Sequence, residues 1–250
     1  MEKNEKKLIL FMPSMNGGGV EKNLIIISNF LSKHIKKITL ITFNNKFNNQ
    51  FNNKIEIINY KKKDKKKYSK YFKYLICLIF LFKEIIKNRN TLVFSFQANI
   101  YVIFLSIILR FKLIIRSNSS PTGWNKNVIK NYLLKIFFRF PKSIIVNSKD
   151  FKKEIDKKFL INSCLIYNPL NKKEILSKSN EKINFKIFNK KKSLKLINIS
   201  RFTNQKDHLT LLKAFQKIHK IINLELLIVG YGENSNKIKS FIKQNKLKNK

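Results

Sequence analysis

Short apolar runs alternate with amphipathic stretches along the first two thirds of the chain. Apolar residues recur at three- and four-residue intervals between Val20 and Leu31, which is typical of a helix with one buried face. The sequence predicts strands at residues 7–12, 38–43, 55–60, 91–96, 112–116 and 143–146, and helices at residues 20–33, 75–87, 100–109, 128–138 and 149–159. A further short stretch at 164–167 ends at Asn168-Pro169. This alternation predicts a doubly wound α/β domain with a parallel sheet.

A second unit of the same kind follows a polar stretch. Residues 171–192 lack a regular apolar pattern, so we expect a linker there, between a first domain at 1–170 and the start of a second at 193–250. Apolar runs at 194–200 and 224–229 flank an amphipathic segment, which predicts one strand–helix–strand unit.

The loops that follow two of these strands carry candidate chemistry. The first strand leads into Gly17, Gly18 and Gly19, whose backbone N–H groups can approach a ligand closely. The strand at 194–200 leads into Arg201 and Lys206, two cations just before a helix. A helix N-terminus with nearby cations is suited to an anion, so phosphate chemistry is the leading interpretation.

Other residues at these loops have a structural interpretation as well as a functional one. Gly230 and Gly232 follow the last strand, where a Gly-x-Gly pair fits a tight turn as well as a nucleotide pocket. An acid such as Glu21 near a helix start favours the helix dipole without any further role. His208 has no partner visible in the sequence, which favours a structural role.

The chain is strongly basic, with 53 Lys and Arg against 14 Asp and Glu and a formal net charge of +39. Such a charge is typical of proteins that bind nucleic acid or anionic membranes. Lysine, asparagine and isoleucine are abundant everywhere, however, and this bias makes a solvated surface the simpler explanation for most lysines. Residues 61–73 contain eight lysines with interleaved Tyr68, Tyr71 and Phe72, which fits either a lipid-contacting patch or a lysine-rich loop.

Several classes of protein are disfavoured. Cys77 and Cys164 form no CxxC pair, so neither a disulfide framework nor a zinc site is expected. The apolar stretches 75–82 and 100–109 fall short of the roughly 18–20 residues that a spanning helix requires. No secretory signal is visible, so we expect a cytoplasmic protein.

The motifs in their order resemble glycosyltransferase family 4, a family of retaining, nucleotide-sugar-dependent enzymes with the GT-B fold of two Rossmann-like domains. The motifs that carry the resemblance are Gly17-Gly18-Gly19-Val20-Glu21, Tyr167-Asn168-Pro169, Ser200-Arg201-Phe202 with Lys206-Asp207-His208, and Val229-Gly230-Tyr231-Gly232. The pattern of Ser95, Asn99, Arg116, Asn118 and Pro121 is similar to bacterial members that extend lipid-linked oligosaccharides, such as N-acetylgalactosaminyl transferases.

The resemblance implies a role for each matching residue. Arg201 and Lys206 would be the catalytic cations, holding the donor diphosphate and neutralising charge on the leaving nucleotide. The donor-binding set would also include the four glycines Gly18, Gly19, Gly230 and Gly232. The acceptor-side residues would be Glu21, Asn99, Arg116 and Asn118.

The resemblance also implies substrates and a location. The donor would be a nucleotide sugar, with a UDP-linked hexose or N-acetylhexosamine expected, and the acceptor a lipid-linked or cell-surface glycan of polysaccharide or lipopolysaccharide biosynthesis. No cofactor or metal is expected, because no acidic DxD pair stands in the right context and two cations can replace a metal ion. The protein would be peripheral on the inner face of the cell membrane, against an anionic surface, with no specific nucleic acid as partner.

The family pattern is incomplete at one point. Family members continue with further strand–helix units that carry two glutamates eight residues apart, and no such pair follows Gly232 before Lys250. We therefore expect a C-terminally truncated chain in which the second domain is incomplete. One alternative is an inactive remnant that binds only membrane or acceptor, and another is a basic nucleic-acid-binding protein.

Overall fold

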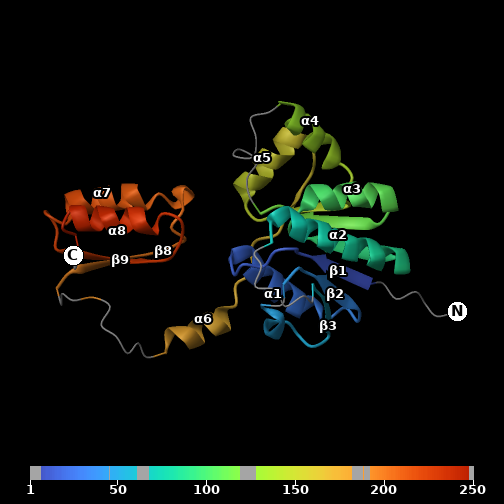
Figure 1. The fold of residues 1–250 in the computed structure, drawn as a ribbon, viewed down its shortest axis with the longest axis horizontal. Coiled ribbons are helices and arrows are strands. Elements are labelled where there is room, and N and C mark those ends of the chain that lie inside the picture. Colours follow the sequence, from blue (N-terminus) through green and yellow to red (C-terminus); the bar gives the residue numbers. More distant parts are fainter. Residues whose placement is uncertain are drawn as a thin grey trace. The chain divides into compact units, whose positions relative to one another are not determined.

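The computed structural model describes residues 7–44, 46–60, 68–118, 128–181, 188 and 192–247. The chain divides into two compact units, unit 1 at Met1–Lys173 and unit 2 at Glu174–Lys250 (Figure 1). Each unit is an α/β structure. The predicted doubly wound α/β class is confirmed.

Unit 1 is built on a parallel sheet of seven strands in the order β3-β2-β1-β4-β5-β6-β7. The strands are β1 (Lys7–Phe11), β2 (Ile38–Ile41), β3 (Ile55–Ile58), β4 (Thr91–Ser95), β5 (Lys112–Arg116), β6 (Ser143–Val146) and β7 (Cys164–Leu165). In register, Phe11 of β1 lies beside Ile41 of β2 and Ser95 of β4. All six predicted strands are present, and the stretch at 164–167 contains the short strand β7. Each strand ends at the same edge of the sheet as its parallel neighbours.

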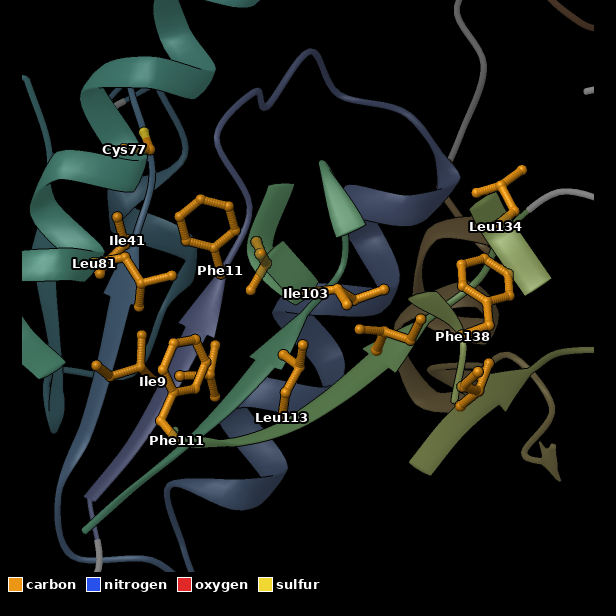
Figure 2. Close-up of a cluster of buried hydrophobic side chains, with 14 of the residues drawn as sticks. Ile9, Phe11, Ile41, Cys77, Leu81, Ile103, Phe111, Leu113, Leu134 and Phe138 are labelled. Atoms are coloured by element: carbon orange, nitrogen blue, oxygen red, sulfur yellow. The ribbon is translucent and has the colours of Figure 1, made fainter. Parts of the chain in front are cut away.

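Helices cover both faces of this sheet. The helices of unit 1 are α1 (Gly19–Leu31), α2 (Lys70–Lys87), α3 (Asn99–Leu109), α4 (Val128–Phe137) and α5 (Lys149–Phe159). Alternate residues of β1 point to opposite sides: Leu10 packs with Leu24 of α1, whereas Ile9 and Phe11 belong to a cluster with buried residues of α2 to α5 (Figure 2). Continuous apolar strands are required in a sheet that is shielded in this way.

The larger core contains Cys77, whose side chain is fully buried between α2 and the sheet. Burial raises the pKa of this thiol to about 12, since the thiolate is poorly solvated there. Cys77 is therefore an inert core residue, and Cys164 is exposed and free.

Helix α2 begins five residues before the predicted helix at 75–87. The hydroxyl of Ser69 accepts a hydrogen bond from the backbone N–H of Phe72, and this cap starts the helix inside the lysine-rich segment. The rest of that segment, residues 61–67, lies outside the described residues, as do residues 119–121 of the predicted loop after β5.

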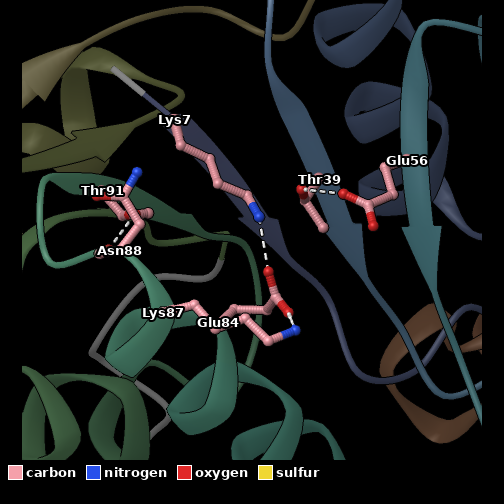
Figure 3. Close-up of polar contacts among 7 residues, drawn as sticks. All are labelled: Lys7, Thr39, Glu56, Glu84, Lys87, Asn88 and Thr91. Carbon is pink, nitrogen blue, oxygen red and sulfur yellow. Dashed lines mark hydrogen bonds and ion pairs between the residues drawn. The ribbon is translucent and has the colours of Figure 1, made fainter. Parts of the chain in front are cut away.

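A buried carboxylate fastens α2 to the start of β1 (Figure 3). Glu84 accepts hydrogen bonds from the Nζ atoms of Lys7 at 2.6 Å and Lys87 at 2.7 Å. Burial alone would raise the pKa of Glu84, but the two lysines outweigh it and lower the pKa from its ordinary value of 4.5. This ion pair links a helix to the sheet across 77 residues of sequence.

Unit 2 contains a parallel pair of strands, β8 (Leu194–Ile199) and β9 (Leu224–Val229), with α7 (His208–Ile218) between them in sequence and α8 (Ser235–Gln244) after them. Two small clusters bury its apolar residues, one around Phe202, Leu212 and Ile238 and the other around Phe215, Leu224 and Leu247. A further helix, α6 (Lys172–Ser179), lies within the stretch 171–192 where we expected a linker.

Candidate functional site

The carboxyl edge of the unit 1 sheet has a topological switch point between β1 and β4. The chain leaves β1 for a helix on one face of the sheet and leaves β4 for a helix on the other. In open α/β sheets, ligands bind in the crevice at such a point. The two loops there are joined, since the backbone N–H of Ser14 donates to the side-chain oxygen of Gln97 at 2.9 Å.

The glycine loop, residues 13–19, follows β1 and opens α1. Gly18 is the N-terminal cap of the helix, with no capping side chain, and residues 16–19 are exposed. A Cβ added at Gly19 would have no neighbour within 4 Å, whereas one at Gly18 would meet Glu21 Oε2 at 2.9 Å. Glu21 accepts a hydrogen bond from the backbone N–H of Asn16 at 3.1 Å. Glu21 thus holds the loop, and the exposed N-terminus of α1 is available to an anion.

Asn99 connects the ends of β4 and β5. Its Oδ1 accepts from the hydroxyl of Ser95 at 2.8 Å, and its Nδ2 donates to the backbone oxygen of Arg116 at 2.9 Å. Nearby, Nδ2 of Asn118 donates to the backbone oxygen of Phe96 at 3.0 Å. Three of the predicted acceptor-side residues therefore lie together at one sheet edge, and each contributes to holding that edge in shape.

Arg116 is the most unusual of these residues because its side chain is only 1% exposed. Its Nη2 donates to Asn168 Oδ1 at 2.8 Å and to the backbone oxygen of Ile166 at 3.3 Å, while its Nε has no partner. Burial lowers the pKa of the guanidinium. Arg116 therefore links the end of β5 to the segment after β7. A direct contact between Arg116 and an acceptor stays a prediction.

The cation loop, residues 200–207, follows β8 in unit 2 and carries both predicted catalytic cations. Arg201 and Lys206 are exposed, and within the described residues neither side chain makes a hydrogen bond or ion pair. Asp207 ends the loop with φ +44° and caps α7 by accepting from the backbone N–H of Thr210 at 3.3 Å. Two solvent-exposed cations beside a helix N-terminus can bind a diphosphate.

Gly230 and Gly232 lie directly against the cation loop. A Cβ at Gly230 would stand 2.0 Å from the backbone oxygen of Ser200, and one at Gly232, where φ is +155°, would stand 2.5 Å from the backbone oxygen of Phe202. The N–H of Phe202 also donates to the oxygen of Tyr231 at 2.8 Å. Both glycines are required for this close approach, which fixes the backbone that carries Arg201.

His208 secures the same loop from the side of α7. It is buried, its Nε2 lies 3.0 Å from the hydroxyl oxygen of Ser200, and its ring packs edge-on against Phe202 with centroids 4.9 Å apart. These contacts join the first residue of the cation loop to the helix that follows it. The structural role that the sequence favours for His208 agrees with this arrangement.

Sequence reasoning did not find Gln97, Asn168 or Ser200 as parts of these sites. Gln97 and Asn168 act across 83 and 52 residues of sequence, and no local spacing reveals such a contact. Ser200 and Asn168 do stand inside the recognised motifs. Both residues lie near the end of a strand, and this position was the signal that could have identified them as parts of the sites.

Across the described ranges, no three His, Cys, Asp or Glu residues gather closely enough to hold a metal ion. Among the helices that the structure describes, none combines the length and the apolar character needed to cross a bilayer.

Residues 179–250 match the family model described as "Glycosyl transferases group 1", a stretch that includes the cation loop and both glycines. An uncharacterized glycosyltransferase of Methanocaldococcus jannaschii is 28% identical over 227 residues, covering 84% of this chain. The chain spans 56% of the length of that curated relative.

Solved structures show the same fold. The chain resembles HepE of Anabaena in complex with UDP and glucose, with a TM-score of 0.67 at 13% identity over 98% of this chain and 67% of that one. A glycosyltransferase of Rickettsia africae gives a TM-score of 0.62 at 19% identity, over 99% of this chain and 67% of the other. The fold is therefore the Rossmann-like GT-B fold, with part of the second domain in unit 2.

Proposed function

We propose that the protein acts as a glycosyltransferase that uses a nucleotide-sugar donor. The observation that carries this proposal is the cation loop, which lies within the stretch that matches the glycosyltransferase family model. Loss of a nucleoside diphosphate from a sugar leaves negative charge on the phosphate oxygens, and fixed cations stabilise that charge. Arg201 and Lys206 are free to do this, on a backbone held by Gly230, Gly232 and the bond between Ser200 and His208.

Unit 1 supplies the other groups of the proposed mechanism. The backbone N–H groups at Gly18 and Gly19 bind a phosphate of the donor from the start of α1. Asn99, Arg116 and Asn118 shape the edge that receives the acceptor, with Arg116 acting through Asn168 rather than from the surface. Glu21 keeps the glycine loop in place.

The finer substrate assignment is also part of the proposal. Because HepE of Anabaena is solved with UDP and glucose, a UDP-linked hexose or N-acetylhexosamine is the donor to test first. The acceptor is a lipid-linked or cell-surface glycan, reached from the inner face of the membrane, and the anomeric configuration is retained. No metal takes part, since Arg201 and Lys206 provide the positive charge.

Donor binding is the direct test. We expect the 250-residue chain to bind UDP in isothermal titration calorimetry and Arg201→Ala to weaken that binding about 10- to 100-fold, because a charge-assisted hydrogen bond contributes roughly 1.5–3 kcal/mol. Lys217→Ala is the matched control, because Lys217 is an exposed cation in the last turn of α7. If Arg201→Ala binds UDP as tightly as the wild type and the control, the role of the cation loop is wrong.

The stereochemistry is tested on the product. A UDP-α-sugar and a polyprenyl-diphosphate-linked acceptor are incubated with the protein, and the new linkage is read by NMR. An α-linked product supports retention, and a β-linked product rejects it while leaving donor binding intact.

A further inference from the structure

Tyr231 is a residue of the candidate site in unit 2 to which the proposed mechanism gives no role. It stands between Gly230 and Gly232 in the turn after β9, and it is 73% exposed. It belongs to neither apolar cluster of unit 2, whereas Phe202 of the cation loop is buried in one of them. Within the described residues, the Tyr231 side chain makes no hydrogen bond and no contact with another ring. Its ring is therefore free to contact a ligand.

The parallel pairing of β8 and β9 continues into this turn. At the end of the two strands, the backbone N–H of Ser200 donates to the backbone oxygen of Val229 at 3.1 Å. Two residues further along both segments, the N–H of Phe202 donates to the oxygen of Tyr231 at 2.8 Å. This repeat extends the register of the strands and places Arg201 beside Tyr231.

The register also puts Arg201 and Tyr231 on the same side of the strand pair. Side chains alternate between the two faces of a strand, and paired residues of parallel strands share a face. In β9, the residues that pack with α7 and α8 are Leu224, Leu226 and Ile228, and both helices lie on one face of the pair (Figure 1). Tyr231 continues the opposite series. The guanidinium and the ring therefore project from the face that α7 and α8 leave uncovered.

The backbone on both sides of Tyr231 is held in place. The N–H of Gly232 donates to the hydroxyl of Ser235 at 3.2 Å, and the N–H of Asn234 donates to the oxygen of Phe202 at 2.9 Å. The close contacts of both glycines with the cation loop fix the same turn. A tyrosine side chain has only two rotatable bonds to order, so a ring on a fixed backbone binds a flat ligand at a low cost in entropy.

A nucleoside diphosphate carries two groups that differ in chemistry. Its phosphates are anionic, and its base is a flat heteroaromatic ring. Every base has a π-face, so stacking on an aromatic side chain is favourable whichever base is present. A hexose is bounded by hydroxyl groups, which require hydrogen-bond partners instead. A cation and an exposed aromatic ring on adjacent residues, Arg201 and Tyr231, therefore match the phosphates and the base of one nucleotide.

We propose that the ring of Tyr231 is the stacking platform for the base of the nucleotide donor, while Arg201 and Lys206 hold the diphosphate. This inference rests on the proposed function and adds to it a residue that determines affinity for the nucleoside. Loss of the ring lowers the affinity for a nucleotide and leaves the affinity for a bare diphosphate unchanged. Loss of the Arg201 guanidinium lowers both affinities, because both ligands carry the phosphates.

The test is isothermal titration calorimetry of the full chain with UDP and with inorganic diphosphate. We expect Tyr231→Ser to weaken UDP binding roughly tenfold and to leave diphosphate binding unchanged. Tyr231→Phe keeps the ring and should bind UDP as the wild type does. Tyr132→Ser is the matched control, because Tyr132 is 64% exposed on α4 of unit 1. Thermal unfolding followed by circular dichroism first establishes that the variants fold, and Tyr231→Leu replaces Tyr231→Ser if the latter does not.

Selective loss of UDP affinity in Tyr231→Ser supports the platform. Unchanged UDP affinity in this variant overturns the platform, and the role of the cation loop stands if Arg201→Ala still weakens UDP binding. An equal loss for UDP and diphosphate would mean that Tyr231 acts through the backbone of the cation loop, which also overturns the platform. Weaker binding of UDP-glucose with unchanged binding of UDP would assign the ring to the sugar instead. A wild type that binds neither UDP nor diphosphate would overturn the proposed function itself, and the platform with it.

Discussion

Strand β1 of unit 1 is buried on both of its faces, whereas strand β8 of unit 2 is open to solvent along most of its length. In β1, Leu8 to Phe11 are all at most 5% exposed. In β8, Leu194 is 57%, Ile197 is 59% and Ile199 is 72% exposed. The two strands share parallel pairing, but β1 is apolar without interruption from Leu8 to Phe11, whereas β8 has Lys195 and Asn198 among its apolar residues. Their different burial therefore reflects both their sequences and the elements around them.

This difference shows that an apolar strand does not by itself make a core. Unit 1 places α1 on one side of its sheet and four helices on the other, so every residue of β1 has a packing partner. Within the described part of unit 2, stability rests on the small clusters that α7 and α8 form with β9 and on the contact of the glycines with the cation loop. The same kind of substitution should therefore lower the free energy of unfolding by different amounts in the two units.

The largest effect is expected from emptying the core of unit 1. Phe11→Ala should lower the free energy of unfolding by about 3–5 kcal/mol, because it removes a fully buried ring. Ile199→Ala in unit 2 should change it by less than about 1 kcal/mol, since most of that side chain is already in water. Urea unfolding followed by circular dichroism measures both. A comparable loss of unfolding free energy for Ile199→Ala would show that β8 is covered in solution, so that the two strands do not differ in burial.

A smaller effect is expected where unit 2 is tightly packed. Gly230→Ala should cost about 1–3 kcal/mol, because its Cβ cannot fit 2.0 Å from the oxygen of Ser200. Gly19→Ala is the control, with open space around the added methyl group, and should cost less than about 1 kcal/mol. Hydrogen exchange by mass spectrometry should show faster exchange at residues 200–208 only in Gly230→Ala. Unchanged exchange there would mean that the glycine contact does not hold the cation loop.

The smallest effect depends on pH. The folded pKa of Glu84 lies below its unfolded value, so its contribution to stability is complete above the unfolded pKa and is lost as pH falls through the folded one. Glu84→Gln should therefore cost about 1–2 kcal/mol at pH 7, and the difference from wild type should shrink below about pH 4. Urea midpoints at pH 7 and pH 3 measure this. Glu233→Gln, at an exposed acid of unit 2, is the control and should change the free energy of unfolding at pH 7 by less than about 0.5 kcal/mol.

Much of the fold was predictable from the sequence because apolar periodicity is a local signal. The strands of unit 1 and the order of its helices follow from it, and the start of α2 was misplaced because the capping serine stands among lysines that suggest a loop. Helix α6 was missed because Lys172–Ser179 is mostly polar and has no buried residue. A helix without buried side chains needs no apolar face, so its sequence lacks the periodicity that predicts a helix.

The candidate site was predictable in part for a related reason. The glycine loop and the cation loop stand next to strands, so their positions could be read from the sequence. The tie from Arg116 to Asn168 and the contact of Gly230 with Ser200 depend on tertiary packing, which local spacing does not encode. The resemblance implies acceptor-side roles for Arg116 and Asn118, and in the structure both side chains donate hydrogen bonds to backbone oxygens at the sheet edge.

The two hydrogen bonds of the Asn99 side chain have a consequence for the edge of the sheet. Asn99 is the first residue of α3, and its side chain accepts a hydrogen bond from Ser95 at the end of β4 and donates one to the backbone oxygen of Arg116 at the end of β5. One side chain thus fixes the start of a helix to the ends of two strands, so we expect the removal of its amide to loosen all three elements together.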